Sequence, residues 1–142
     1  MKQNGSFSLM TAILIPTIFI HLVVIIEITN YHLKRQQLAT STDIAALAGA
    51  AQLGIASNNV IIASATNYFN ANNNNTESQI NITVGHWNAN TSTFTPTTAN
   101  PNAIQTNASE PFISTNFESL NSITASSIAV KNPLSSASYL IQ

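Results

Sequence analysis

Near its N-terminus the sequence carries one long apolar segment, from Phe7 to Ile28, interrupted by Pro16 and His21. As an α-helix that rises about 1.5 Å per residue, this segment would extend roughly 33 Å, close to the thickness of the hydrocarbon layer of a bilayer. It is longer than the apolar core of a cleaved secretory signal, and the residues after it offer no small-residue cleavage site. The segment therefore predicts a retained membrane helix, with a short stub before it and a head beside the membrane.

The charges that flank this segment leave its orientation open. Lys2 and the α-amine precede it, whereas Lys34 and Arg35 follow it, so the positive-inside rule weighs both sides nearly equally. The long C-terminal part is almost uncharged, and its translocation across the membrane is the simpler arrangement.

Composition argues against several classes of function. Only 6% of the 142 residues are charged and the formal net charge is −1, so no basic surface for nucleic acid is expected. The chain has no cysteine, which excludes a disulfide framework and a cysteine nucleophile. Its acidic residues and three histidines have none of the spacings of paired catalytic carboxylates or of a metal site. We therefore expect no catalytic residue, no metal, no cofactor and no enzymatic activity.

The polar stretch after the apolar segment also has a helical pattern, and no turn signal separates the two. Apolar residues recur at three- and four-residue spacing from Leu33 to Ile55, and the alanine-rich run DIAALAGAAQL has a high helix propensity. We expect one continuous helix from Phe7 to about Leu53, on the order of 70 Å long. Gly54 should end it, because glycine adopts the left-handed conformation without strain.

A small α+β head is predicted after this helix. A second helix should run from Asn59 to about Phe69, with Ser57 or Asn58 as its N-cap. An Asn-rich loop follows at residues 70–76.

Strand patterns fill the remainder of the head. Ile80, Ile82 and Val84 alternate with polar residues in the clearest strand, Gln79–Gly85. Residues 86–94 are expected to form a turn, and a short returning strand within them is left open. Further strands are expected at residues 103–108 and 123–130, the latter ended by Pro133. The predicted fold class is α+β: a long transmembrane helix, a short second helix and an antiparallel sheet of about three strands. The expected divisions are a stub (1–6), the transmembrane helix (7–28), its exposed continuation (29–56) and the head (57–142).

Several patterns, in this order, resemble one family. The N-terminal pattern GSFSLMTAILIP, with Gly5 and the Ile15-Pro16 step, and the run Asp43–Ala50 resemble the TadE/TadG-like proteins of the Tad (Flp) pilus-assembly system. Further on, VGHWNANTSTFTP with residues 102–106 resembles the family's strand pair, and residues 126–130 resemble its closing strand. The D-x-S-x-S motif of the von Willebrand factor A-like domain in larger members is missing, so the resemblance concerns the N-terminal module only.

The resemblance implies a non-enzymatic, pilin-like subunit of a Tad/Flp-type pilus or of its assembly and initiation complex. The implied partners are the lipid bilayer and other pilin-like subunits or pilus-assembly membrane proteins, in a homo- or hetero-oligomer. The implied location is the bacterial inner membrane with the head outside the cytoplasm, or the cell surface after assembly. The alternative is a membrane-tethered adhesin or binding module that does not polymerise, whose head would be active without assembly.

Processing of the N-terminus is also left open. A prepilin peptidase would cut between Gly5 and Ser6. The fifth residue of the mature chain would then be Met10, whereas type IV pilins usually have Glu there.

Assembly contacts are expected along the long helix, because helices associate in lipid through close packing and interhelical hydrogen bonds. Ionisable groups within a membrane segment are functional candidates, with interfacial or packing roles as the alternative. The residues concerned are Pro16, His21, Glu27, Asp43, Ala45, Ala46, Ala48, Gly49 and Ala50. In the head, Trp87 and Phe94 are candidates for a surface contact, with a role of Trp87 in a small core as the alternative.

Overall fold

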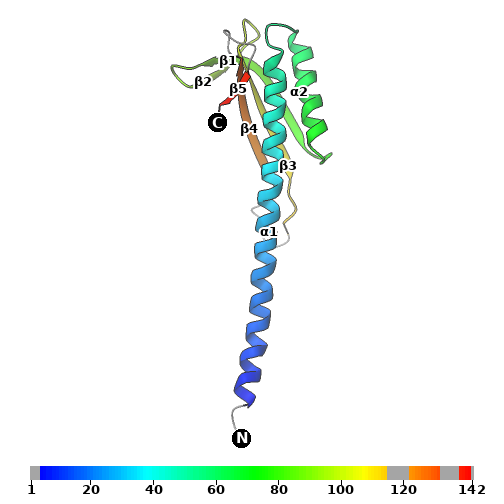
Figure 1. Ribbon diagram of the computed structural model, residues 1–142, viewed down its shortest axis with the longest axis vertical. Coiled ribbons are helices and arrows are strands. Elements are labelled where there is room, and N and C mark those ends of the chain that lie inside the picture. The colour runs from blue at the N-terminus through cyan, green and yellow to red at the C-terminus, as the bar shows by residue number, and fades with distance from the viewer. Residues whose placement is uncertain (1–3, 115–121, 132–137, 142) are drawn as a thin grey trace.

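The computed structural model describes residues 4–114, 122–131 and 138–141. One helix, α1 (Asn4–Ala51), runs the length of the molecule, and the head is packed along its C-terminal part (Figure 1). The helix passes through Pro16 without a break, so the predicted continuous helix is confirmed. It begins at Asn4 and thus spans the Gly5–Ser6 bond.

The end of α1 also lies where the sequence predicts it. The helix stops at Ala51, and Gly54 has a φ of +73°, which a residue with a side chain rarely adopts. Lys131 Nζ donates a hydrogen bond of 2.5 Å to the Leu53 carbonyl. A cation here is favourable, because the carbonyls that end a helix carry a partial negative charge.

The second helix, α2 (Asn58–Asn72), returns alongside α1 (Figure 1). Ser57 is its N-cap, but the Ser57 side chain forms no capping hydrogen bond. The helix continues beyond the predicted end at Phe69 into the Asn-rich run. Asn72 Nδ2 donates to the Tyr68 carbonyl, and Ser41 Oγ of α1 donates to the Asn72 carbonyl, so local and tertiary hydrogen bonds support this last turn.

An antiparallel five-stranded sheet forms the other layer, in the order β2-β1-β3-β4-β5. The α+β class is confirmed, and the sheet has more strands than the three expected. The bounds are β1 Gln79–Asn88, β2 Thr93–Pro96, β3 Ala103–Pro111, β4 Ser122–Lys131 and β5 Ser138–Ile141.

Two details of the sheet differ from the sequence prediction. The turn is shorter than the expected residues 86–94: His86–Asn88 still belong to β1, and the chain reverses at residues 89–92, where Ser92 has a φ of +51°. The short strand β2, which pairs with β1, is the returning strand that the sequence left open. The predicted stop at Pro133 lies outside the described residues.

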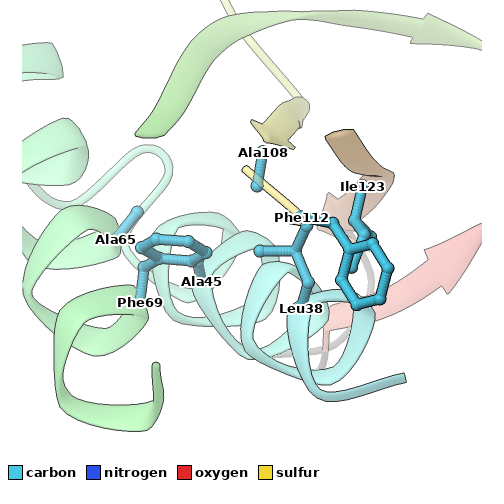
Figure 2. Packing of buried hydrophobic residues seen from close by; sticks show 7 residues of the cluster. All are labelled: Leu38, Ala45, Ala65, Phe69, Ala108, Phe112 and Ile123. Atoms are coloured by element: carbon cyan, nitrogen blue, oxygen red, sulfur yellow. The ribbon is translucent and has the colours of Figure 1, made fainter. Parts of the chain in front are cut away.

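One face of the sheet packs on both helices. α1 lies over β3 and β4, and α2 lies over β1. Figure 2 shows the cluster at the end of this interface that is nearer the N-terminus of α1, in which Phe69 of α2 and Leu38 of α1 are almost fully buried. The side chains drawn are Leu38, Ala45, Ala65, Phe69, Ala108, Phe112 and Ile123. On the opposite face, Asn81, Asn107 and Ser126 are exposed, so the sheet has one apolar and one polar face.

Candidate functional site

Two parts of α1 have different surroundings. We call residues 7–28 the apolar half and residues 38–51 the head-bound half. Large side chains of the apolar half point into open space, with Phe7 78% and Ile20 65% exposed. A contiguous apolar surface of this size is typical of a membrane or protein contact. Within the described residues, this helix is the one that is long and apolar enough to cross a membrane.

Several polar side chains on and just after the apolar half hydrogen-bond to carbonyls of their own helix. The hydroxyls of Thr11 and Thr17, and that of Thr29 just after this half, each donate to the carbonyl four residues earlier, at 2.8–2.9 Å. His21 Nδ1 lies 2.7 Å from the Thr17 carbonyl oxygen. These bonds lower the cost of placing polar groups in a hydrocarbon layer.

Pro16 and His21 lie on the exposed surface of this half. Pro16 has no N–H, so the Ala12 carbonyl loses its helical donor. His21 lines a shallow groove with Met10, Leu14 and Thr17. Both predicted residues are therefore accessible to a neighbouring helix.

Glu27 occupies a different setting at the end of the apolar half. Its Oε1 atom accepts a hydrogen bond of 2.6 Å from Ser114 Oγ, in the segment after β3. The head is thus attached to α1 well below the main core. Sequence reasoning predicted Glu27 as a packing residue and did not single out Ser114.

Further contacts strengthen this junction. The carboxylate of Glu110, which is 5% exposed, lies 3.8 Å from Lys34 Nζ and accepts a hydrogen bond of 3.0 Å from Ser78 Oγ. A carboxylate buried without such partners would be costly, whereas the half-exposed Lys34 limits the net gain of the ion pair. The ring of Phe112 meets Tyr31 edge-on at 5.3 Å. Lys34 and Glu110 are far apart in the sequence, so no local sequence pattern could have predicted their ion pair.

The small residues of the head-bound half lie inside the chain's own fold. Ala45, Ala46 and Ala50 are fully buried. A Cβ atom on Gly49 would lie 2.6 Å from Cδ1 of Ile104, so the glycine allows the helix to approach β3 closely. Their proposed use between subunits is untested, and in the chain itself they serve helix–sheet packing.

Ala48 and Asp43 remain partly accessible on this half. Both are half-buried. The described part of the chain provides no ion-pair partner for Asp43.

Trp87 and Phe94 are brought together by the β1–β2 hairpin, where they are direct cross-strand partners. Both are half-buried. The Phe94 ring covers Gly85, where an added Cβ would clash with the ring, and Trp87 N donates to Asn102 Oδ1 at 2.6 Å. These contacts anchor the hairpin, and the surface role predicted for the two aromatics is untested.

Among the residues that the structure describes, no group of three or more His, Asp or Glu side chains could hold a metal ion. The described residues form a packed head from which the exposed, apolar part of α1 extends.

Two family models together match most of the chain. The model of a family described as putative Flp pilus-assembly TadE/G-like matches residues 5–52, which include α1 almost entirely. A second model, described as putative Tad-like Flp pilus-assembly, matches residues 36–131, from the head-bound half to the end of β4. No curated protein and no solved structure matches the chain. The long apolar helix fits a single-pass membrane anchor. Since the two models together span both halves of α1 and most of the head, the chain belongs to the Tad-like Flp pilus-assembly family, with a TadE/G-like N-terminal module.

Proposed function

We propose that this protein is a non-enzymatic, pilin-like subunit of a Tad/Flp-type pilus or of its assembly and initiation complex. One observation carries the proposal: a single helix serves as the apolar anchor in its first half and as the spine of the head in its second half. A subunit built in this way can be held in a membrane by a surface that is also suited to packing against other helices. Family membership supports the pilus-related role and does not favour the tethered adhesin.

The proposed partners follow from the two kinds of surface. The apolar half contacts lipid before assembly and neighbouring helices after it, with Pro16 and His21 as the contact candidates. The head-bound half is already covered by the sheet and α2. We therefore assign subunit contacts first to the apolar half. The proposed location is the bacterial inner membrane, with the head outside the cytoplasm.

The direct test is to shear whole cells and to immunoblot the released filaments and the membranes. A structural pilus subunit appears in the sheared filaments, and its intact mass there also reports whether the Gly5–Ser6 bond is cut. Strict retention in the membrane would contradict the filament-subunit role and leave the assembly-complex role. Substitution of His21 by Leu tests the apolar half: it should lower incorporation into filaments, whereas Ile20→Leu on the same exposed helix surface should leave incorporation unchanged.

A further inference from the structure

The segment that follows β3 descends along α1 toward the apolar half (Figure 1). We call residues 112–114 the boundary segment. Phe112 is buried against Tyr31, and Ser114 binds the Glu27 carboxylate at 2.6 Å. The boundary segment is therefore fixed to α1 at both ends.

Ile113 lies between these two attachments and points away from the fold. Its side chain is 90% exposed, the highest fraction among the large apolar side chains that the structure describes. An isolated exposed isoleucine is ordinary on a protein surface, so its exposure alone carries no conclusion. Its position on the long axis of the molecule is what matters.

That position coincides with the expected edge of the hydrocarbon layer. Glu27 follows Phe7 by 20 residues, which at about 1.5 Å per residue corresponds to about 30 Å of helix, the thickness of a typical hydrocarbon layer. Because Ser114 hydrogen-bonds to Glu27, Ile113 lies within one residue of the same level. Tyr31 and His32 follow on α1, and rings of this kind are enriched at the boundary between lipid and water.

Charges next to Ile113 already have partners within the chain. Glu27 accepts from Ser114, and Glu110 is paired with Lys34. Lys34 and Arg35 lie about two helical turns beyond Glu27 and are exposed, which favours contact with anionic headgroups. The exposed Ile113 therefore lies beside the end of the apolar surface that residues 7–28 form on α1.

We propose that Ile113 inserts into the bilayer boundary, so that the boundary segment is a second membrane contact of the head. The occupant of this surface is lipid. With α1 and Ile113 both in contact with the membrane, the head has a fixed tilt and a fixed rotation about the helix axis. This inference rests on the membrane anchorage in the proposed function, and its test separates the two.

The absence of cysteine allows single-site labelling of the full chain. The variants are Ile113→Cys, Ile18→Cys in the apolar half and Asn90→Cys in the exposed β1–β2 turn, each carrying a nitroxide. Each is reconstituted in vesicles of phosphatidylcholine and phosphatidylglycerol, and collisions of the nitroxide with oxygen and with a water-soluble nickel chelate are measured by electron paramagnetic resonance. All three positions are exposed, and the fluorescence of Trp87, the only tryptophan, checks that each variant is folded.

The inference predicts that the ratio of oxygen to nickel collisions at Ile113 is severalfold above that at Asn90 and below that at Ile18. A ratio at Ile113 equal to that at Asn90, with Ile18 in lipid, overturns the boundary contact and leaves the anchor intact. A label at Ile113 shielded from both reagents, more strongly at high protein-to-lipid ratio, also overturns it, because a second copy then covers the site. An aqueous ratio at Ile18 contradicts the membrane anchor itself.

Discussion

The two halves of α1 are equally helical but use opposite kinds of side chain. The apolar half presents large residues such as Phe7, Ile13 and Phe19, which the rest of the chain does not cover. Apart from Leu38, the residues that the head-bound half buries are small: Ser41, Thr42, Ala45, Ala46, Gly49 and Ala50. Fluid lipid accommodates large side chains of any shape, whereas a helix packed on a sheet at close range requires small ones. Side-chain size, more than hydrophobicity, separates the two environments along this helix.

The largest expected effect comes from removing a large side chain that spans the head-bound interface. Phe69 is 1% exposed and packs between α2, α1 and the sheet. Phe69→Ala should lower the free energy of unfolding of the head by about 3–5 kcal/mol, because it leaves a cavity. Urea unfolding in detergent micelles, followed by Trp87 fluorescence, measures this loss. The control is the adjacent Tyr68→Ala, which is half exposed and should change the free energy by less than about 0.5 kcal/mol.

A second prediction concerns a large side chain introduced among the small, buried residues of the head-bound half. Ala46 is fully buried, whereas Ala51, at the end of the same helix, is exposed. Ala46→Leu should destabilise the head by about 1–3 kcal/mol through overpacking. Ala51→Leu adds the same atoms where space is free, and it should be nearly neutral in the same unfolding experiment. Equal effects of the two changes would contradict close helix–sheet packing.

The junction between the halves should contribute less. Lys34→Met removes the cation beside the buried Glu110 and should cost about 1 kcal/mol, since Lys34 is 47% exposed and Ser78 still binds the carboxylate. Arg35→Met removes a neighbouring exposed charge and serves as the control. If both variants lose stability equally, general electrostatics rather than the Glu110 pair is responsible.

Removing the hydrogen bond between Ser114 and Glu27 should lower the stability of the head by a similar or smaller amount than Lys34→Met, and its effect should be local. Ser114→Ala should cost about 1 kcal/mol. It should also accelerate amide hydrogen exchange in the boundary segment while exchange in β3 stays unchanged. Ser114→Thr keeps the hydroxyl and should restore slow exchange; failure of this rescue would argue against the hydrogen bond.

Changes in the apolar half should have the smallest effect on the head. Ile13 is 64% exposed and lies in the apolar half, 14 residues before Glu27. Ile13→Ala should leave the urea midpoint of the head unchanged. A shift of the midpoint would show that the two halves are energetically coupled.

The sequence predicted those parts of the fold whose signals are local. The continuous helix and its stop at Gly54 follow from periodicity and from one glycine, and β1, β3 and β4 follow from alternating residues. The strands β2 and β5 have four residues each, too short for a period-two pattern to emerge. Helix α2 was predicted too short because the hydrogen bond of Ser41 to Asn72 is tertiary and leaves no local pattern.

The candidate site was predictable only in part, for a related reason. The alanine–glycine stripe signals close packing but does not say against what, and the structure places it against the chain's own sheet and α2. The junction formed by Glu27, Ser114, Lys34 and Glu110 joins residues more than 70 positions apart, which no spacing rule detects. Ile113 gains significance only from its place beside Glu27.

The central claim, that one helix is divided between lipid and head, is tested most directly by proteolysis in sealed vesicles. Wild-type chain and Phe69→Ala are digested with proteinase K, and the surviving peptides are measured by mass spectrometry. We predict that Phe69→Ala loses protection of the head but keeps a lipid-protected peptide with boundaries near Phe7 and Ile28. Loss of that peptide together with the head would contradict the claim, because the apolar half would then depend on the head and not on the bilayer.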